Sequence, residues 1–141
     1  MQHRNLEHDI YKQVARHMSL YYQGTPYHFD PAGVHTTSRY YRSLYKTINP
    51  EAGFPDLTVF QRSHPKFGDY IGLMIEIKEP GVTIKKRDGS LVADPHVRDQ
   101  AAWIQKLNAK GYYACFATGW PSVQEVLDTY LRGAASIPIE F

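Results

Sequence analysis

The sequence is poor in cysteine, with Cys115 alone among its 141 residues. A single cysteine excludes an internal disulfide and is typical of a protein from a reducing compartment. Long apolar runs are also missing: none approaches the roughly 20 residues that a membrane-spanning helix needs, so we expect no membrane contact. Met1 to Asn5 are polar and contain no apolar core of a signal peptide, which predicts a cytoplasmic protein.

The composition shows no sign of intrinsic disorder. Hydrophobic residues make up 43% of the chain and charged residues 21%, as in globular proteins. A chain of this length can bury a core without disulfides or metals as staples. We therefore expect one domain that spans residues 1–141, and we expect no organic cofactor.

No charge of one sign dominates either, since the formal net charge is +2. The distribution of the cations says more than their sum, because two basic clusters occur where the chain looks loop-like. One is interleaved with tyrosines, which suits contacts to phosphate and to bases or sugars. A tyrosine-rich structural helix and an ordinary solvated hairpin stay open as alternatives. The candidate nucleic-acid-binding residues are Arg39, Tyr40, Arg42, Lys46, Lys85, Lys86 and Arg87.

The stretch from Gly53 to Lys78 holds the most distinctive pattern of the chain. Two runs rich in β-branched and aromatic residues, 57–60 and 70–78, predict neighbouring strands joined by a turn-rich segment. Side chains alternate between the faces of a strand, so Glu76 and Lys78 share one face near the end of the second strand. The opposite face is filled by Ile71, Leu73, Ile75 and Ile77.

Asp56 follows the turn Gly53-Phe54-Pro55 and begins the first of these strands, close to Glu76. Two converging carboxylates repel each other, and a hard divalent cation such as Mg²⁺ or Mn²⁺ is the usual remedy. A lysine beside them can orient or activate a water molecule. The alternative is a solvated cross-strand face with Asp56 as a turn cap.

The first helix is predicted from Asn5, a good N-cap, to about Tyr22. Glu7 falls near the middle of its apolar stripe, where a carboxylate must be paired, hydrated or bound to a metal. Exposure at the helix start, or stabilisation by the helix dipole, explains Glu7 equally well. A shorter helical piece is expected from about Ser38 to Lys46.

The second half of the chain alternates between helix and strand signals. Residues 82–93 predict a β-hairpin with a type I′ turn at Asp88-Gly89. A helix should follow from Asp94 and Pro95 to Gly111, with Gln100 pointing inward near its start. Residues 112–118 predict a buried strand. A capping box of Ser122 and Glu125 predicts the start of a last helix, which Gly133 ends.

The ordered set Gly-x-Pro-Asp at 53–56, Glu-Ile-Lys at 76–78 and Gln100 with Trp103 resembles the PD-(D/E)XK nuclease superfamily. Within it the sequence is most similar to the VRR-NUC domain, the virus-type replication and repair nuclease. The resemblance implies an α/β fold with a central mixed β-sheet flanked by helices, like a restriction endonuclease. It covers about residues 6–131.

The resemblance also implies a site for Mg²⁺ or Mn²⁺ formed by Asp56, Glu76 and the backbone carbonyl of Ile77, with Glu7 as a further candidate ligand. Lys78 is then expected to position or deprotonate the attacking water, and Gln100 to orient the assembly.

Small domains of this type, often carried by phages, resemble Holliday-junction resolvases and act as homodimers on branched or duplex DNA. This similarity predicts a structure-selective DNA endonuclease in a bacterial or phage-infected cell. The alternatives are a less selective nicking, flap or end-directed nuclease of the same fold, a non-catalytic DNA-binding module, and an interaction module of a replication complex.

Overall fold

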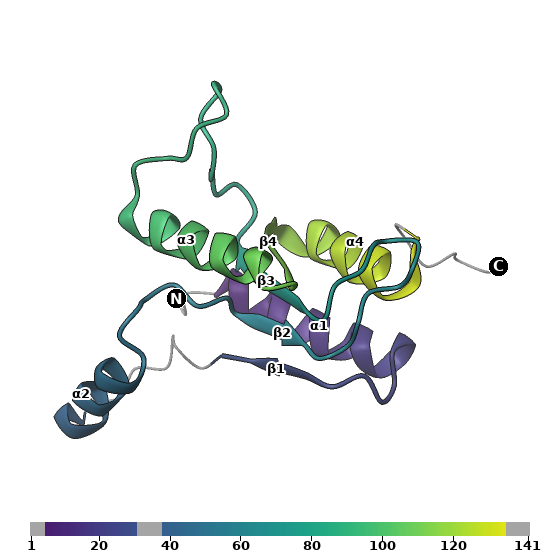
Figure 1. Cartoon of the computed structure of the whole chain (residues 1–141), viewed down its shortest axis with the longest axis horizontal. Coiled ribbons are helices and arrows are strands. Elements are labelled where there is room, and N and C mark those ends of the chain that lie inside the picture. Colours follow the sequence, from purple (N-terminus) through teal and green to yellow (C-terminus); the bar gives the residue numbers. More distant parts are fainter. Residues whose placement is uncertain (1–4, 31–37, 135–141) are drawn as a thin grey trace.

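The computed structural model describes residues 5–30 and 38–134, which form four strands and four helices. The sheet has the order β1-β2-β3-β4, in which β1, β2 and β3 are antiparallel and β4 is parallel to β3 (Figure 1). The strands are Tyr27–Phe29 (β1), Leu57–Val59 (β2), Leu73–Lys78 (β3) and Tyr113–Thr118 (β4). The helices are Leu6–Tyr21 (α1), Arg39–Ile48 (α2), Pro95–Ala109 (α3) and Gly119–Arg132 (α4).

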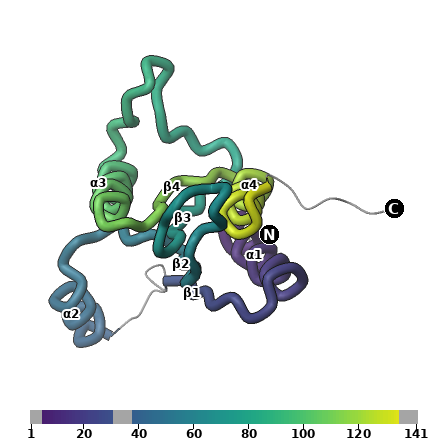
Figure 2. Tube along the Cα trace, turned by 45° about the vertical axis from the view of Figure 1, so that its right-hand side comes forward, coloured from purple at the N-terminus to yellow at the C-terminus, as the bar shows by residue number. Residues whose placement is uncertain are grey.

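Helices cover both faces of this sheet. Figure 2 shows α3 on one side of the strands and α1 with α4 on the other. Alternation along β3 explains both layers, since Leu73, Ile75 and Ile77 are fully buried against α1 and α4. Met74 packs with Leu107 of α3 on the opposite face. The predicted α/β class, with a central mixed sheet flanked by helices, is confirmed.

Most helix ends lie where the sequence predicts them. The side chain of Asn5 accepts a hydrogen bond from the backbone N–H of His8 at 3.1 Å, and Asp94 caps α3 in the same way. Gly133 ends α4 with the left-handed φ of +76° that glycine adopts without strain. α2 extends two residues beyond the predicted end at Lys46.

The predicted capping box of the last helix is wrong. α4 begins at Gly119, so Ser122 lies inside its first turn, and the cap residue Thr118 makes no side-chain cap. Pro121 allows this early start, because the first backbone N–H groups of a helix have no intrahelical partner and a proline removes none that is needed.

Three further differences concern strands. β3 begins at Leu73, which leaves Ile71 outside it and 42% exposed. β1 was not predicted, because its three residues lie between Pro26 and Pro31 in a stretch of broken pattern. Residues 82–93 form a hairpin-like arm with only one β-bridge, between Lys85 and Leu91.

The turn of this arm is not type I′, which needs positive φ at two successive residues. Among the described residues only glycines have positive φ, so Asp88 does not adopt it. Lys86 N–H instead donates to the carbonyl of Ser90 at 2.8 Å, which closes a three-residue loop with Gly89 at φ +86°. The Asp88 carboxylate stabilises this loop by accepting the Ser90 backbone N–H at 2.9 Å.

No helix in the described ranges combines the length and the apolar character that crossing a membrane requires. Residues 1–4, on which the cytoplasmic prediction partly rests, lie outside those ranges.

A buried polar group joins α1 to α4. Asp128 is fully buried, and its Oδ1 lies 2.8 Å from Nε2 of His17 and accepts the hydroxyl of Tyr22 at 2.6 Å. These contacts fix the rotation of α1 about its axis, because His17 and Tyr22 flank its last turns. The same rotation places Glu7, at the other end of α1, against the end of the sheet.

We predict that Asp128→Ala lowers the free energy of unfolding by about 1–3 kcal/mol, because it leaves His17 and Tyr22 without their partner. Chemical denaturation monitored by circular dichroism measures this change. Glu125→Ala, an exposed position on the same helix, is the control and should stay close to the wild type. Equal stability of the two variants would contradict the structural role of the buried group.

Candidate active site

Asp56 stands where β2 begins, beside the end of β3. Leu57 pairs with Ile75, so the chain just before β2 faces the last residues of β3. The Asp56 carboxylate accepts the backbone N–H of Ile77 at 2.8 Å, in the position that a strand carbonyl would otherwise take. The Asp56 side chain thus continues the hydrogen bonding between β2 and β3 by one bond, which holds its carboxylate against β3.

The turn before Asp56 is pressed onto α3. Gly53 has φ +100°, and a Cβ at this position would come within 2.7 Å of the backbone carbonyl carbon of Asp99. Only glycine therefore lets the turn approach α3 so closely. Trp103 reinforces the contact, since its indole N–H donates to the Glu51 carbonyl at 3.2 Å and its ring meets Phe54 edge-on at 5.2 Å.

Glu76 is the buried centre of the site, only 4% exposed. Its Oε1 accepts a hydrogen bond from Nε2 of Gln100 at 2.8 Å and lies 3.8 Å from Nζ of Lys78. Its Oε2 and the Oε1 of Gln100 are buried and have no hydrogen-bond partner among the described residues. When Glu76 is ionised, two acceptors therefore remain unsatisfied at the point where α3 meets β3, whereas a protonated Glu76 can donate to Asp56.

The electrostatics of the carboxylate pair favour a proton or a cation. Burial, and then the charge of Asp56, raises the pKa of Glu76 to about 9. Burial also raises the pKa of Asp56, although the N–H of Ile77 opposes this shift by stabilising the charged form. Without a bound cation, Glu76 is therefore the carboxyl that holds a proton at neutral pH.

Glu7 lies at the margin of this pair. Its pKa is raised first by burial and then by the charge of Asp56, while the charge of Lys78 lowers it. The start of α1 thus faces the end of the sheet. Glu7 is partly buried, so it stays accessible to solvent and to a ligand.

Two residues near the site were missed. Tyr11 lies one helical turn after Glu7, and burial together with the charge and a side-chain hydrogen bond of Asp56 raises its pKa far above the ordinary value. Asp30 follows β1, and its backbone N–H donates to the Asp56 carbonyl at 2.8 Å. The four-residue spacing of Glu7 and Tyr11 was a usable signal, whereas Asp30 depends on a strand that the sequence did not reveal.

The donor set fits a hard divalent cation. No three His, Cys, Asp or Glu side chains in the described ranges lie together as a metal cluster, so an ion would depend on fewer side chains. Asp56, the unpaired oxygen of Glu76 and the Ile77 carbonyl supply oxygen atoms, which Mg²⁺ and Mn²⁺ prefer. The unpaired buried oxygen is the observation that supports this fit, because a cation would satisfy it.

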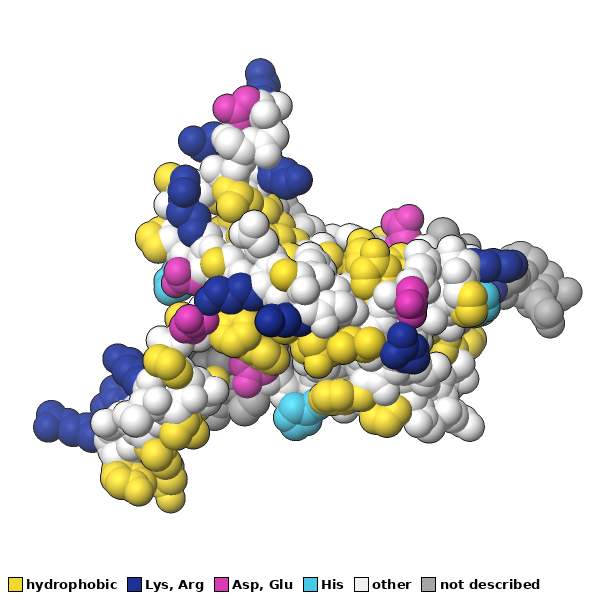
Figure 3. Space-filling model, viewed as in Figure 1, with side chains coloured by type: hydrophobic (Ala, Val, Ile, Leu, Met, Phe, Trp, Pro, Cys, Tyr) yellow, Lys and Arg dark blue, Asp and Glu magenta, His cyan; other side chains and the backbone are white. Residues whose placement is uncertain are grey.

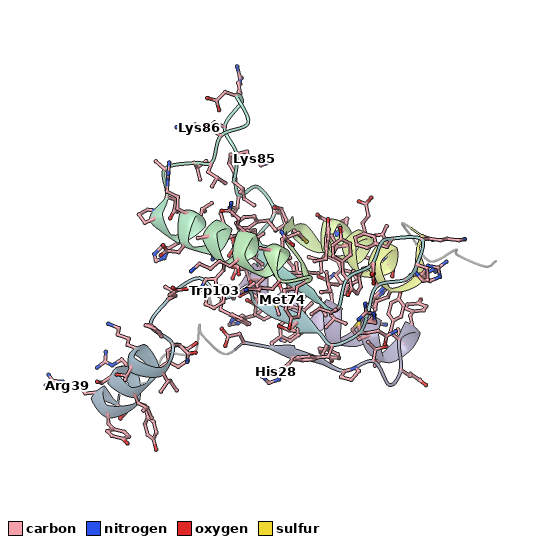
Figure 4. All side chains as sticks on the ribbon, in the orientation of Figure 1. His28, Arg39, Met74, Lys85, Lys86 and Trp103 are labelled. Carbon is pink, nitrogen blue, oxygen red and sulfur yellow. The ribbon has the colours of Figure 1, made fainter. Side chains whose placement is uncertain are left out.

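The predicted nucleic-acid-binding residues are not part of this cluster. They lie on two projections that extend away from the sheet, with Arg39 on α2 and Lys85 and Lys86 on the arm of residues 82–93 (Figures 3 and 4). All seven are exposed. Both projections adjoin the site along the chain, since α2 leads to Asp56 and the arm connects Lys78 with α3.

Cys115 has no role in this site. It lies in β4 against the main core, and burial raises the pKa of its thiol to about 12. A thiolate nucleophile is therefore not populated at neutral pH.

No protein-family model and no curated protein matches this chain. Among solved structures, the chain is similar to one described as a "VRR_NUC domain protein", with a TM-score of 0.63 and 24% sequence identity. The alignment covers 96% of this chain and 100% of the other. The structural match predicted by the motif order is thereby found, and at this level of identity it shows a shared fold.

We predict that Glu76→Gln makes the metal-free protein more stable, by about 1–3 kcal/mol at neutral pH, because the Glu76 carboxyl must take up a proton when the chain folds and the neutral amide need not. The pKa of Glu76 is raised from 4.5 to about 9 on folding, so the wild type loses stability as pH rises between these values and the variant does not. Denaturant unfolding in EDTA across this range measures the difference.

Glu125→Gln, the same change at an exposed position, is the control for this experiment. A variant that is less stable than the wild type throughout the pH range would show that the Glu76 carboxylate is well satisfied without a cation.

Proposed function

We propose that this chain is a nuclease that depends on a divalent metal and hydrolyses phosphodiester bonds of DNA. The observation that carries the proposal is the pair of buried, unpaired acceptors on Glu76 and Gln100, beside Asp56 and Lys78. This arrangement lies in a fold shared with a VRR_NUC domain protein. A site of two carboxylates, a lysine and a glutamine at the end of a strand suits phosphoryl chemistry.

Asp56, Glu76 and the Ile77 carbonyl would hold Mg²⁺ or Mn²⁺, and Glu7 would reach the same or a second ion. A cation there supplies positive charge that polarises the scissile phosphate and makes water more acidic. The protein residues do the rest. Gln100 fixes the rotamer of Glu76 through its 2.8 Å hydrogen bond, and Ile77 N–H fixes Asp56.

Lys78 is placed to act on the attacking water. Its side chain is 12% exposed, and its amine lies on the Glu76 side of β3. Beside Glu76, the charged amine can orient a water molecule and stabilise negative charge that develops on the phosphate. To take the proton of that water, the amine must first lose its own proton to solvent. Tyr11 would help by holding the Asp56 carboxylate in its orientation.

Two basic projections would hold the substrate. Arg39, Arg42 and Lys46 line a shallow hollow along one face of α2, and Tyr40 lies beside them. Lys85, Lys86 and Arg87 lie at the exposed end of the arm. α2 precedes Asp56 in the chain and the arm follows Lys78, so a DNA backbone that contacts both projections would pass near the carboxylate pair.

The finer proposal concerns the substrate. We infer a preference for branched DNA, as in a Holliday-junction resolvase, with a homodimer supplying two sites for two strands. The spread of the two projections supports this inference, because a branched duplex presents phosphates in more than one direction. A nicking, flap or end-directed nuclease uses the same chemistry and is separated from a resolvase by substrate choice.

We predict that Lys78→Ala reduces cleavage about 100-fold or more while leaving DNA binding and folding unchanged. A labelled four-way junction, a linear duplex and a single strand are incubated with Mg²⁺, Mn²⁺ or EDTA. Lys66→Ala, an exposed lysine in a distant loop, is the control. Symmetric cuts near the crossover support a resolvase, and equal cleavage of all substrates supports a less selective nuclease. Binding without cleavage in either metal would falsify the proposed hydrolysis.

The combined change of Lys85, Lys86 and Arg87 to alanine should weaken DNA binding and leave the rate at saturation nearly unchanged. Log affinity falls with log salt concentration, and each lost phosphate contact makes this negative slope less steep by about 0.9. Fluorescence anisotropy over a salt series measures this slope. An unchanged slope would show that the arm does not contact DNA and is only a solvated hairpin.

A further inference from the structure

A second hollow of the molecule lies on the surface between α1 and α4, which pack side by side on one face of the sheet (Figure 2). Its volume of about 330 Å³ is within the range of small-molecule sites. We call it the α1–α4 hollow. One stripe of α1 and the first turns of α4 line it, with the residues Gln13, Arg16, His17, Leu20, Tyr21, Trp120 and Gln124.

Two aromatic rings lie close to His17 in this lining. Between ring centroids, Tyr21 is 5.0 Å and Trp120 is 5.3 Å from His17. Tyr21 is 53% exposed and Trp120 is half-buried, so both rings offer surface to a ligand. Accessible aromatic rings are the platforms on which unpaired nucleic-acid bases stack.

The polar groups of the α1–α4 hollow suit the edge of a base and a phosphate. Gln13 and Gln124 carry side-chain amides that both donate and accept hydrogen bonds, as the polar edge of a base does. Asp128 holds His17 through Nε2, and no described residue is hydrogen-bonded to Nδ1, which leaves this nitrogen for a ligand. Arg16 adds an exposed positive charge, which attracts phosphate. The lining therefore matches the three parts of a nucleotide that proteins recognise.

The α4 side of the hollow adjoins the candidate active site. Thr118 pairs with Lys78 across the sheet, and α4 begins at the next residue. A Cβ at Gly119 would lie 3.5 Å from the Pro80 ring, so the start of α4 is packed against the chain just after Lys78. Trp120 is the residue that follows, which places the hollow beside the end of β3.

α1 leads to the hollow from the same site. Glu7, at the margin of the carboxylate pair, precedes Gln13 by six residues, which is roughly 9 Å along a helix. This length corresponds to roughly three stacked nucleotides at 3.4 Å each. A DNA strand that passes the carboxylates can therefore reach the hollow with a base a few positions from the cleaved bond.

We propose that the α1–α4 hollow binds one unpaired nucleotide of the DNA strand, a few positions from the cleaved bond. Tyr21 and Trp120 stack on the base, and Arg16 contacts its phosphate. A paired base keeps both faces inside the duplex, so only a single-stranded segment, as at a flap or an opened branch point, can enter. The proposal rests on the proposed nuclease function for the path of the strand, and it names the part of the substrate that this surface recognises.

The first experiment measures the affinity for a labelled oligothymidylate and for a blunt duplex of the same length by fluorescence anisotropy, in EDTA. The hollow variant of the full chain is Arg16→Ala with Tyr21→Ala. The control variant is Phe60→Ala with Arg62→Ala, which also loses one aromatic ring and one positive charge, at exposed positions outside the hollow. Thermal unfolding shows whether both variants keep the folded core.

The hollow variant should bind the single strand about 10-fold more weakly than the wild type, because it loses a stacking contact and a phosphate contact. Its affinity for the duplex should match that of the control variant, which reports the effect of one lost charge.

The second experiment uses the wild type, so it does not depend on the folding of a variant. An oligothymidylate that carries one iodouracil is irradiated together with the protein, and the cross-linked peptide is identified by mass spectrometry. Iodouracil reacts with aromatic side chains that contact it. We expect the cross-link at Tyr21 or Trp120.

Equal affinity of the hollow and control variants for the single strand overturns the proposal, as does a cross-link confined to the tyrosines of α2. A wild type that binds the duplex but no single strand also overturns it. Failure of the proposed hydrolysis is a separate result, because it appears as absent cleavage in Mg²⁺ and Mn²⁺, whereas binding at the hollow is measured in EDTA.

Discussion

The burial of two carboxylates against each other is the constraint on which this structure depends. Removing a charge from water without a partner is costly, and doing so twice at one place is more so. Ile77 N–H, the Gln100 amide and the Lys78 amine each compensate part of this cost. One oxygen of Glu76 stays unpaired among the described residues. The folded chain is thus less stable at this point than it would be with neutral residues, which is characteristic of a site kept for function.

The rest of the fold positions this pair. Gly53 lets the turn before Asp56 touch α3 at Asp99 and Gln100, and a hydrogen bond from Trp103 holds the turn there. Asp56 and Gln100 are therefore both held close to Glu76. The buried Asp128 fixes α1 and with it Glu7. Where the chain leaves the site in either direction it forms exposed projections, α2 and the arm, which carry the basic residues. The same order of elements therefore packs the carboxylates tightly and places the basic residues on the exposed segments before β2 and after β3.

The sequence predicted the structure best where a local backbone rule alone decides the position of a side chain. Strict alternation in β3 placed Glu76 and Lys78 on one face, and the Asp94-Pro95 start oriented Gln100 inward. It failed where context decides: three residues of β1 carry no periodic signal, so Asp30 was missed with them. Ser122 is a good helix cap, but α4 begins three residues earlier because Pro121 is tolerated in its first turn. Asp88-Gly89 favours a type I′ turn, but the hydrogen bonds of Ser90 close a different loop. The exposure of α2 could not be predicted, because the same amphipathic pattern describes a helix packed on its own core.

The most direct test of the carboxylate pair is a crystal structure grown with Mn²⁺ and recorded for anomalous scattering. The account predicts a peak in direct contact with Asp56, the unpaired oxygen of Glu76 and the Ile77 carbonyl, with Gln100 still bonded to Glu76. The absence of an anomalous peak at every Mn²⁺ concentration, with the Glu76 and Asp56 carboxyl groups at hydrogen-bond distance, would contradict it. The pair would then be a structural pair of carboxyl groups that share a proton, and the proposed metal-dependent chemistry could not occur there.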